Sequence, residues 1–325
     1  MNKPAEQLLL IDRQHVRALL PMTECIDVMA DAMTAVSAGS VHVEPRLKES
    51  FAGGEGAMLL MRAESVQLGV YAIKQISLLP RNAGLQKPVI QGVITLFELA
   101  GGSPVAVIDG TEITALRTAA TSGLATRELA RTDARSLGVF GTGVQAVSHI
   151  AAVCAVRPIE EIQIWGRDSA RAGQLAEQLG QDTGIEVRAV SDPALAAASD
   201  ILCTVTGSAE PILKGDWVQP GTHINLVGAH SLDTREADTA LVARSSVYVD
   251  LLASVWAEAG DIVIPMQEGA IGEDHILGEI GQLLAGNIRG RADAAEVTIF
   301  KSLGLAAQDL YAANHVYRRA TAAGS

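Results

Sequence analysis

Aromatic residues and positive charge are both scarce in this sequence. Phe, Trp and Tyr make up 3% of the 325 residues, and 25 Lys and Arg stand against 37 Asp and Glu, a formal net charge of −12. Nucleic-acid binding needs a basic surface and stacking side chains, so we expect no nucleic-acid partner. Any anionic ligand needs a local cluster of cations, because the surface as a whole repels anions.

Cysteine pairs, metal-binding spacings and membrane-spanning runs are also lacking. Cys25, Cys154 and Cys203 lie far apart in apolar runs, as reduced buried thiols do. The seven histidines form no HExxH or paired Cys/His spacing, so no metal site is expected. The N-terminal MNKPAEQ resembles no signal peptide, and every run of membrane-spanning length is interrupted by charges or turn residues. We expect a cytoplasmic protein with no membrane partner.

The first part of the chain shows an α+β pattern. Hydrophobic residues make up 48% of the sequence, which suits a packed globular protein, and the length favours two domains. Helical spacing predicts a helix over 23–39, capped by Thr23 and ended by Gly39. The period then changes to two, which predicts a mixed or antiparallel sheet with a hairpin turn at Gly101-Gly102. Its strands are expected at 57–62, 68–79, 89–99 and 105–109.

From residue 112 the pattern becomes a strict alternation of strands and helices. After a helix that begins near Glu112, strands are predicted at 136–140, 161–165, 185–190, 201–206, 223–227 and 247–251. Asp168 and the Asp192-Pro193 pair open helices between these strands. A last helix is expected from Glu296 to about residue 320. The order predicts an α/β fold with a doubly wound parallel sheet.

The segment LGVFGTGVQA carries a G-x-G-x-x-A pattern between a predicted strand and a predicted helix. Gly141 allows the tight turn, Gly143 lets the backbone approach a pyrophosphate, and Ala146 permits close helix packing. The pyrophosphate would lie at the helix N-terminus. The alternative is an ordinary glycine-rich turn, but the strand-motif-helix order favours a Rossmann dinucleotide site.

The end of the second predicted strand bears on the choice of coenzyme. NAD-binding sites usually place an acid there, whereas this strand ends in Gly166-Arg167. A guanidinium at this point favours the 2′-phosphate of NADP(H), with NAD(H) as the second possibility. Asp168 is better explained as a helix cap, although it could be a ribose partner.

Three cations stand apart from the predicted surface helices. Lys74 shares its strand face with apolar residues, and a buried ammonium there needs an anionic partner or ligand. A side chain that snorkels to the sheet edge is the alternative. Arg46 and Arg117 are, taken singly, expected in surface ion pairs. Together with a coenzyme fold, the three cations suggest a small carboxylate substrate.

These segments together resemble the ornithine cyclodeaminase/mu-crystallin family. The resemblance rests on Pro45-Arg46, the strand that carries Lys74, and the segments LRTAATSGLA, GTGVQA, INLVGA, EAGD, GEIGQLLAG and IFKSLGLAAQDL. It implies a Rossmann dinucleotide-binding domain over 118–299, inserted in an α+β substrate-binding and dimerisation domain formed by 1–117 and 300–325. A homodimer is implied as well.

The resemblance also implies a role for individual residues. Arg46, Lys74 and Arg117 would hold the substrate carboxylate, with Lys74 nearest to the reacting atoms and Glu258 facing the same pocket. The residues expected to contact NADP(H) or NAD(H) are Thr118, Gly141, Thr142, Gly143, Val144, Gln145, Ala146, Gly166, Arg167, Thr204, Val205, Thr206, Val227, Gly228, Lys301 and Ser302.

The residue at position 230 helps to distinguish the cyclodeaminases of this family from its reductases. Cyclodeaminases carry a catalytic aspartate just after a VGG-type turn, where this chain reads GAHSLDTREAD and has His230. The downstream carboxylates Asp233 and Glu236 need not reach the same point. The missing acid disfavours cyclodeamination, and the pattern resembles the branch of cyclic ketimine reductases. His230 itself is either catalytic or a histidine satisfied within a loop.

The resemblance thus implies NAD(P)H-dependent reduction of Δ1-pyrroline-2-carboxylate to L-proline, with Δ1-piperideine-2-carboxylate and L-pipecolate as a second pair. An alanine-type amino-acid dehydrogenase stays open, because open-chain and cyclic imines share a carboxylate and a C=N carbon. Ornithine cyclodeaminase is the disfavoured enzymatic alternative. A mu-crystallin-type protein that binds small molecules together with NADPH is the nonenzymatic one.

Overall fold

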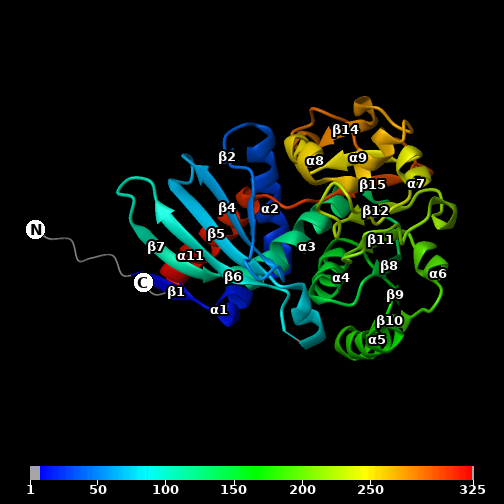
Figure 1. Ribbon diagram of the computed structural model, residues 1–325, viewed down its shortest axis with the longest axis horizontal. Coiled ribbons are helices and arrows are strands. Elements are labelled where there is room, and N and C mark those ends of the chain that lie inside the picture. Colours follow the sequence, from blue (N-terminus) through cyan, green and yellow to red (C-terminus); the bar gives the residue numbers. More distant parts are fainter. Residues whose placement is uncertain (1–7, 86, 324–325) are drawn as a thin grey trace, which may run out of the picture. The chain divides into compact units, whose positions relative to one another are not determined.

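The computed structural model describes residues 8–85 and 87–323, which fall into two compact units (Figure 1). Unit 1 comprises Met1–Arg117 and Gly304–Ser325, and unit 2 comprises Thr118–Leu303. The sequence placed the return of the chain at residue 300. The structure places it at Gly304, because the strand Thr298–Lys301 still belongs to the sheet of unit 2.

Unit 1 is built on one mixed sheet. Its strand order is β1-β7-β6-β5-β4-β2, with β3 paired to β4, and all pairs are antiparallel except β1 with β7. The hairpin between β6 and β7 turns at Gly102, whose φ of 71° suits glycine. The strands are β1 (Leu9–Ile11), β2 (His42–Val43), β3 (Leu47–Ser50), β4 (Ala57–Ser65), β5 (Val70–Leu78), β6 (Ile90–Glu98) and β7 (Pro104–Asp109).

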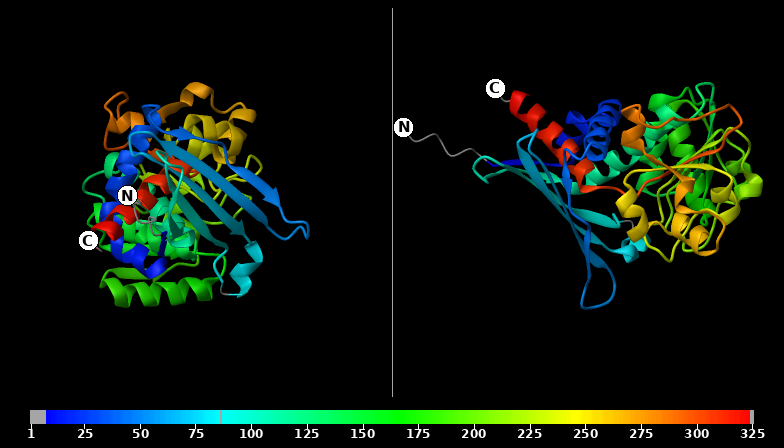
Figure 2. Two further views of the ribbon diagram at one scale, coloured as in Figure 1. Left: turned by 90° about the vertical axis from the view of Figure 1, so that its left-hand side faces the viewer. Right: turned by 90° about the horizontal axis from the view of Figure 1, so that it is seen from above.

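Helices cover one face of this sheet. Figure 2 shows α2 and α11 on the same side of the strands, and α11 packs against β4, β5 and α2. The helices that begin in unit 1 are α1 (Arg13–Leu19), α2 (Met22–Ser37), α3 (Gly110–Leu129) and α11 (Ala306–Ala323), with a 3-10 turn η1 (Pro80–Leu85). The expected cap Thr23 is wrong, because α2 begins one residue earlier with Pro21 as its N-cap.

Alternation along the strands separates a buried face from a half-exposed one. In register across β4, β5, β6 and β7 lie Met61, Lys74, Ile94 and Ile108, all buried. Residues an odd number of positions from these four along a strand point to the opposite face. Tyr71 and its stacked neighbour Phe97 are examples, and both are half-buried. Lys74 therefore occupies a core position of the sheet.

Unit 2 contains a parallel sheet with the strand order β10-β9-β8-β11-β12-β15-β13-β14. This order reverses at β8, as in the doubly wound dinucleotide-binding fold, so the predicted fold class is confirmed. The strands are β8 (Ser136–Phe140), β9 (Glu161–Trp165), β10 (Glu186–Ala189), β11 (Ile201–Thr204), β12 (His223–Leu226), β13 (Ser246–Val249), β14 (Ile276–Glu279) and β15 (Thr298–Lys301).

Both faces of the central strands β11, β12 and β15 are buried, which explains why these strands read as continuous apolar runs. Ile201 and Cys203 of β11 join one core with residues of α4 and α5, whereas Leu202 joins a second core with α6 and α7. The helices are α4 (Val144–Val156), α5 (Ser169–Thr183), α6 (Pro193–Ala197), α7 (Thr239–Ala243), α8 (Leu252–Glu258), α9 (Gly260–Gln267) and α10 (Ile280–Leu284), with 3-10 turns η2 (Gly215–Trp217) and η3 (Glu273–His275).

The helix predicted from Glu296 to residue 320 is wrong in its first part. Residues Thr298–Lys301 form β15, which is fully buried between β12 and β13, and the helix begins only at Ala306. Gly304, with a φ of 83°, separates the two elements. A short buried strand followed by an apolar helix reads as one apolar stretch, so periodicity alone did not divide them.

None of the helices in the described ranges 8–85 and 87–323 has both the length and the apolar character that crossing a membrane requires.

Candidate functional site

The buried face of the unit 1 sheet holds an ion pair between β5 and α11. The Nζ atom of Lys74 lies 2.6 Å from Oδ2 of Asp309, and both side chains are 1% exposed. Nζ also donates a long hydrogen bond of 3.5 Å to Oγ1 of Thr114 on α3. A buried ammonium of this kind is stable only where such partners offset its lost hydration.

The same carboxylate binds a second cation. Nε of Arg117 donates to Oδ1 of Asp309 at 3.1 Å, and its Nη1 donates to Oε1 of Gln308 at 2.8 Å. Arg46 reaches the same segment, because its Nη2 donates to the carbonyl oxygen of Gly304 at 2.9 Å. Thus the three cations singled out in the sequence gather around the start of α11. We call Arg46, Lys74, Arg117 and Asp309 the lysine cluster.

Electrostatics within the lysine cluster depress the proton affinity of Lys74. Burial, with Arg117 and Arg46 adding repulsion, lowers the pKa of Lys74 to about 7, although Asp309 acts in the opposite direction. Near neutral pH the amine therefore exists in both protonation states. Lys74 and Arg117 contact the carboxylate of Asp309, and Arg46 lies close enough to repel Lys74. Grouped cations of this kind can hold a monoanionic ligand.

Sequence reasoning missed Asp309, although a signal was present. On α11 this acid shares a helix face with the apolar Ala312, Ala313 and Val316, all buried. An acid on an apolar helix face needs a cation, just as Lys74 on an apolar strand face needs an anion. Glycine is favoured beside it, because Gly304 has a φ of 83°, and a Cβ there would lie 2.5 Å from Nη1 of Arg117 and displace that guanidinium.

In unit 2 the predicted glycine-rich turn follows β8 and opens α4. Gly141 has a φ of 132°, and a Cβ on it would lie 2.9 Å from Val205. Gly143 is the N-cap of α4, no side chain caps this helix, and a Cβ on Gly143 would meet nothing within 4 Å. Ala146 is fully buried. An uncapped helix N-terminus with an open approach fits a dinucleotide pyrophosphate.

The neighbouring residues Thr142, Val144 and Gln145 belong to the same turn. Thr142 and Gln145 are half-buried, whereas Val144 is 59% exposed at the start of α4. A Cβ on Gly166 would lie 2.7 Å from Cγ2 of Thr142, so the loop after β9 passes directly over the turn.

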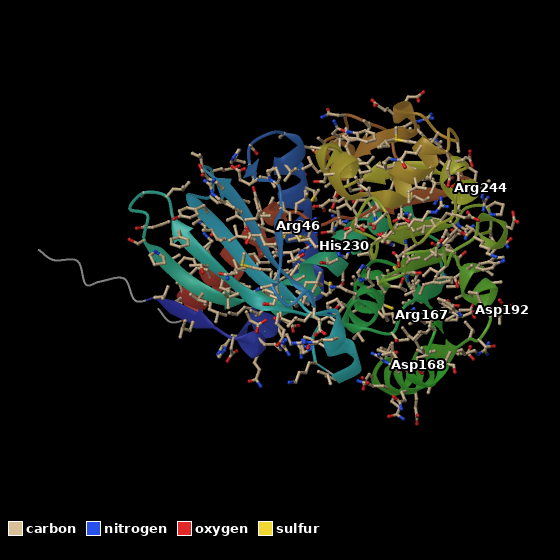
Figure 3. The ribbon with its side chains drawn as sticks, viewed as in Figure 1. Arg46, Arg167, Asp168, Asp192, His230 and Arg244 are labelled. Atoms are coloured by element: carbon tan, nitrogen blue, oxygen red, sulfur yellow. The ribbon has the colours of Figure 1, made fainter. Side chains whose placement is uncertain are left out.

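Arg167 and Asp168 follow β9 and are both exposed (Figure 3). Oδ1 of Asp168 accepts hydrogen bonds from the backbone N–H groups of Ala170 and Arg171, each at 3.1 Å. The interpretation of Asp168 as a helix cap is therefore confirmed. The guanidinium of Arg167 stands beside it, at the place where a doubly wound fold binds the adenosine ribose.

The loops after β11 and β12 are tied to a buried acid. Glu236 accepts hydrogen bonds from the hydroxyl groups of Thr204 and Thr206 and from the backbone N–H groups of Thr206 and Gly228. Val205 and Val227 beside them are half-buried. These predicted coenzyme residues thus belong to loops that the protein itself fixes.

Lys301, predicted to cap the coenzyme, is held by hydrogen bonds within unit 2. Its Nζ donates to Oδ2 of Asp261 at 2.9 Å and to the carbonyl oxygen of Ala229 at 2.6 Å, and its side chain is fully buried. Ser302 is also buried, and its N–H donates to the carbonyl oxygen of Leu226. Sequence reasoning did not foresee that Asp261 would hold Lys301.

Three further predicted residues take different environments in unit 2. His230 is exposed, with Nδ1 2.9 Å from the carbonyl oxygen of Gly228 (Figure 3). Glu258 is half-buried at the end of α8, and Thr118 is buried on α3. Asp233 is exposed whereas Glu236 is buried, so the two carboxylates downstream of His230 do not share one environment.

The described part of the chain, residues 8–85 and 87–323, contains no group of three or more His, Cys, Asp or Glu side chains able to hold a metal ion.

Known proteins resemble this chain over almost its entire length. The model of the ornithine cyclodeaminase/mu-crystallin family matches residues 6–324. A Δ1-pyrroline-2-carboxylate reductase from Bacillus cereus is 32% identical, covering 98% of each chain. The structure of Thermococcus litoralis Δ1-pyrroline-2-carboxylate reductase with NADH and L-proline is 38% identical, with a TM-score of 0.94 and 98% coverage of both chains. An archaeal alanine dehydrogenase dimer with bound NAD is 29% identical, with a TM-score of 0.91, covering 98% of this chain and 97% of that one.

Replacing Asp309 by Asn should lower the pKa of Lys74 further below about 7, because the carboxylate that favours the ammonium form is lost while burial and the arginines remain. The measurement is an NMR titration of isotope-labelled lysine, with the Lys74 resonance assigned through Lys74→Arg. Thr114→Val removes a hydrogen bond but no charge, so it serves as the control and should change the pKa much less. An unchanged pKa in Asp309→Asn would contradict the ion pair.

Proposed function

The chain belongs to the ornithine cyclodeaminase/mu-crystallin family, and we propose that it is an NAD(P)H-dependent reductase that converts Δ1-pyrroline-2-carboxylate to L-proline, with Δ1-piperideine-2-carboxylate as a second substrate. The observation that carries the proposal is the lysine cluster, in which Lys74, with a pKa of about 7, and Arg117 both contact Asp309 while Arg46 binds the backbone beside them. The names of the similar reductases support the choice of substrate.

In this proposal unit 1 binds the substrate and unit 2 binds the coenzyme. Arg117 and Arg46 hold the carboxylate, since a guanidinium offers paired donors to both oxygens of an anion. Arg117 is itself fixed by Asp309 and Gln308, so its donors are oriented before the substrate arrives. Orientation of the imine by its own carboxylate then supplies part of the rate enhancement.

Lys74 is the proton donor in the proposed reaction. The coenzyme, when bound, supplies a hydride to the imine carbon. The Lys74 ammonium donates a proton to the imine nitrogen, because a protonated iminium is a better hydride acceptor than a neutral imine. With a pKa of about 7, Lys74 can give up this proton and regain it from water near neutral pH. Asp309 holds Nζ in place throughout.

His230 receives no proton step in this scheme. It is exposed and contacts the backbone of its own loop, which supports a structural interpretation of the residue. It also occupies the place where the resemblance puts the aspartate of cyclodeaminases, so ammonia loss is not the proposed reaction. Glu258 is proposed only as a residue near the substrate, without a step of its own.

The direct test mixes the protein with NADPH or NADH and Δ1-pyrroline-2-carboxylate while nicotinamide absorbance is followed. Steady decay with formation of L-proline is expected. Lys74→Met and Arg117→Met should each lower the turnover by ~100-fold or more while coenzyme binding persists. Lys48→Met, an exposed lysine on β3 of the same sheet, is the matched control and should keep full activity.

Other outcomes would replace the proposal with a specific alternative. Faster turnover with pyruvate and ammonia would indicate an alanine-type dehydrogenase, and release of ammonia from ornithine without added coenzyme would indicate a cyclodeaminase. Coenzyme binding without any decay across these substrates would indicate a binding protein.

We further propose a preference for NADP(H), although the similar structures hold NADH or NAD. The exposed guanidinium of Arg167 can bind a 2′-phosphate, and Oδ1 of Asp168 is committed to capping α5. Arg167→Ala should lower kcat/KM with NADPH by about tenfold, since a charged hydrogen bond contributes roughly 1.5–3 kcal/mol. With NADH the value should stay unchanged. Arg171→Ala, on the first turn of α5, is the control, and equal losses with both coenzymes would contradict the preference.

A homodimer is proposed through the half-exposed face of the unit 1 sheet. Tyr71, Ile73, Val93 and Phe97 lie on this face, and an apolar sheet face of this kind is typically covered. The dimeric alanine dehydrogenase supports the proposal. Sedimentation should give a dimer for the wild type and a monomer for Val93→Asp. Val66→Asp, at the exposed turn before β5, should remain dimeric. A monomeric wild type would contradict the proposed homodimer.

A further inference from the structure

Glu236 is a buried carboxylate whose four hydrogen bonds join three loops of unit 2. Oε1 accepts from the N–H of Thr206 at 2.8 Å and from its hydroxyl at 2.7 Å. Oε2 accepts from the hydroxyl of Thr204 at 2.7 Å and from the N–H of Gly228 at 2.6 Å. The side chain has no exposed surface. An ionised carboxylate satisfies all four donors at once, and the two backbone donors cannot reverse their role.

A second buried acid lies next to Glu236 and is neutralised by a lysine. Oδ1 of Asp261 accepts from the backbone N–H groups of Glu236 and Ala237, and its Oδ2 binds Lys301. Glu236, Asp261 and Lys301 therefore form one buried network, which we call the Glu236 network. With Glu236 in the ionised form that its four hydrogen-bond donors favour, two carboxylates and one ammonium give the network a net charge of −1. Burial, with Asp261 adding repulsion, raises the pKa of Glu236, although Lys301 and the two threonine hydroxyls act in the opposite direction.

The Glu236 network lies where the nicotinamide half of a dinucleotide binds in this fold. Thr204 ends β11, and Gly228 follows β12, so both anchored loops leave the carboxyl edge of the parallel sheet. In a doubly wound fold the pyrophosphate lies at the first turn, after β8, and the adenosine ribose lies beyond β9. The other half of the dinucleotide consequently extends over β11 and β12.

We propose that Glu236 is a positioning residue that fixes the two loops around the nicotinamide and that the negative charge of its network favours the oxidised ring. This inference rests on the proposed coenzyme-dependent function. The nicotinamide ring is neutral when reduced and carries a positive charge when oxidised. A fixed buried anion therefore stabilises the oxidised form relative to the reduced form, and it favours release of the hydride.

The test compares the affinities of the oxidised and the reduced coenzyme, measured by titration without substrate at pH 8. Kd is determined for NADP⁺, NADPH, NAD⁺ and NADH. Glu236→Gln keeps the shape of the side chain but removes its charge. We expect this variant to weaken binding of the oxidised form more than of the reduced form, by a factor on the order of fivefold or more.

Two threonine variants separate charge from geometry. Thr204→Val removes one hydrogen bond to Glu236 but leaves the charge, so both coenzyme forms should lose affinity by the same factor. Thr222→Val is the matched control, because Thr222 is equally buried and makes its hydroxyl hydrogen bond to Ser199 at the amino end of β12. Its affinities for both forms should equal those of the wild type.

The outcomes distinguish this inference from the proposed function. Equal losses for both redox forms in Glu236→Gln, or no loss in either, would overturn the inference while leaving the reductase intact. A wild type that binds none of the coenzymes would overturn both. Should Glu236→Gln fail to fold, Asp261→Asn makes the same change in net charge from another element, and an unshifted affinity ratio in that variant counts against the inference equally.

Discussion

The contact between Lys74 and Asp309 is the constraint around which unit 1 is organised. Taking an ammonium and a carboxylate out of water costs several kcal/mol per ion, and only close geometry with further hydrogen bonds offsets this. Arg117 supplies those bonds, and Gly304 leaves room for its guanidinium. In the proposed function, a small carboxylate binds to the cations of this cluster. The same burial brings the pKa of the amine to about 7.

Unit 2 shows the opposite charge balance. Glu236 and Asp261 outnumber Lys301 in its buried network, and the four donors around Glu236 hold the loops after β11 and β12. In the proposed reaction the substrate is an anion, whereas the coenzyme ring gains positive charge when it is oxidised. In the proposal, each unit thus carries the buried charge that suits its own ligand. Removal of one member of either network should lower the free energy of unfolding, because a charged partner would then stay buried and unpaired.

Much of this architecture was accessible from the sequence, but the partners of its charges were not. Strands β8 and β9 were predicted with their observed bounds, because Gly141 and Gly166 directly follow them. Lys74 stood out as a cation on an apolar face. Asp309 and Asp261 were not recognised as the partners of Lys74 and Lys301, because periodicity reports which face a residue occupies and not which distant segment covers it. The break at Gly304 and strand β15 were missed because a short buried strand followed by an apolar helix reads as one apolar stretch.

The pH dependence of kcat/KM in both directions tests the role of Lys74 most directly. Reduction needs the ammonium form, so its kcat/KM should fall as the pH rises through about 7, and oxidation of L-proline needs the neutral amine, so its kcat/KM should rise over the same range. In Asp309→Asn both limbs should move together to lower pH, because the ammonium form loses its anionic partner. An unchanged pH dependence of kcat/KM in this variant would contradict Lys74 as the proton donor.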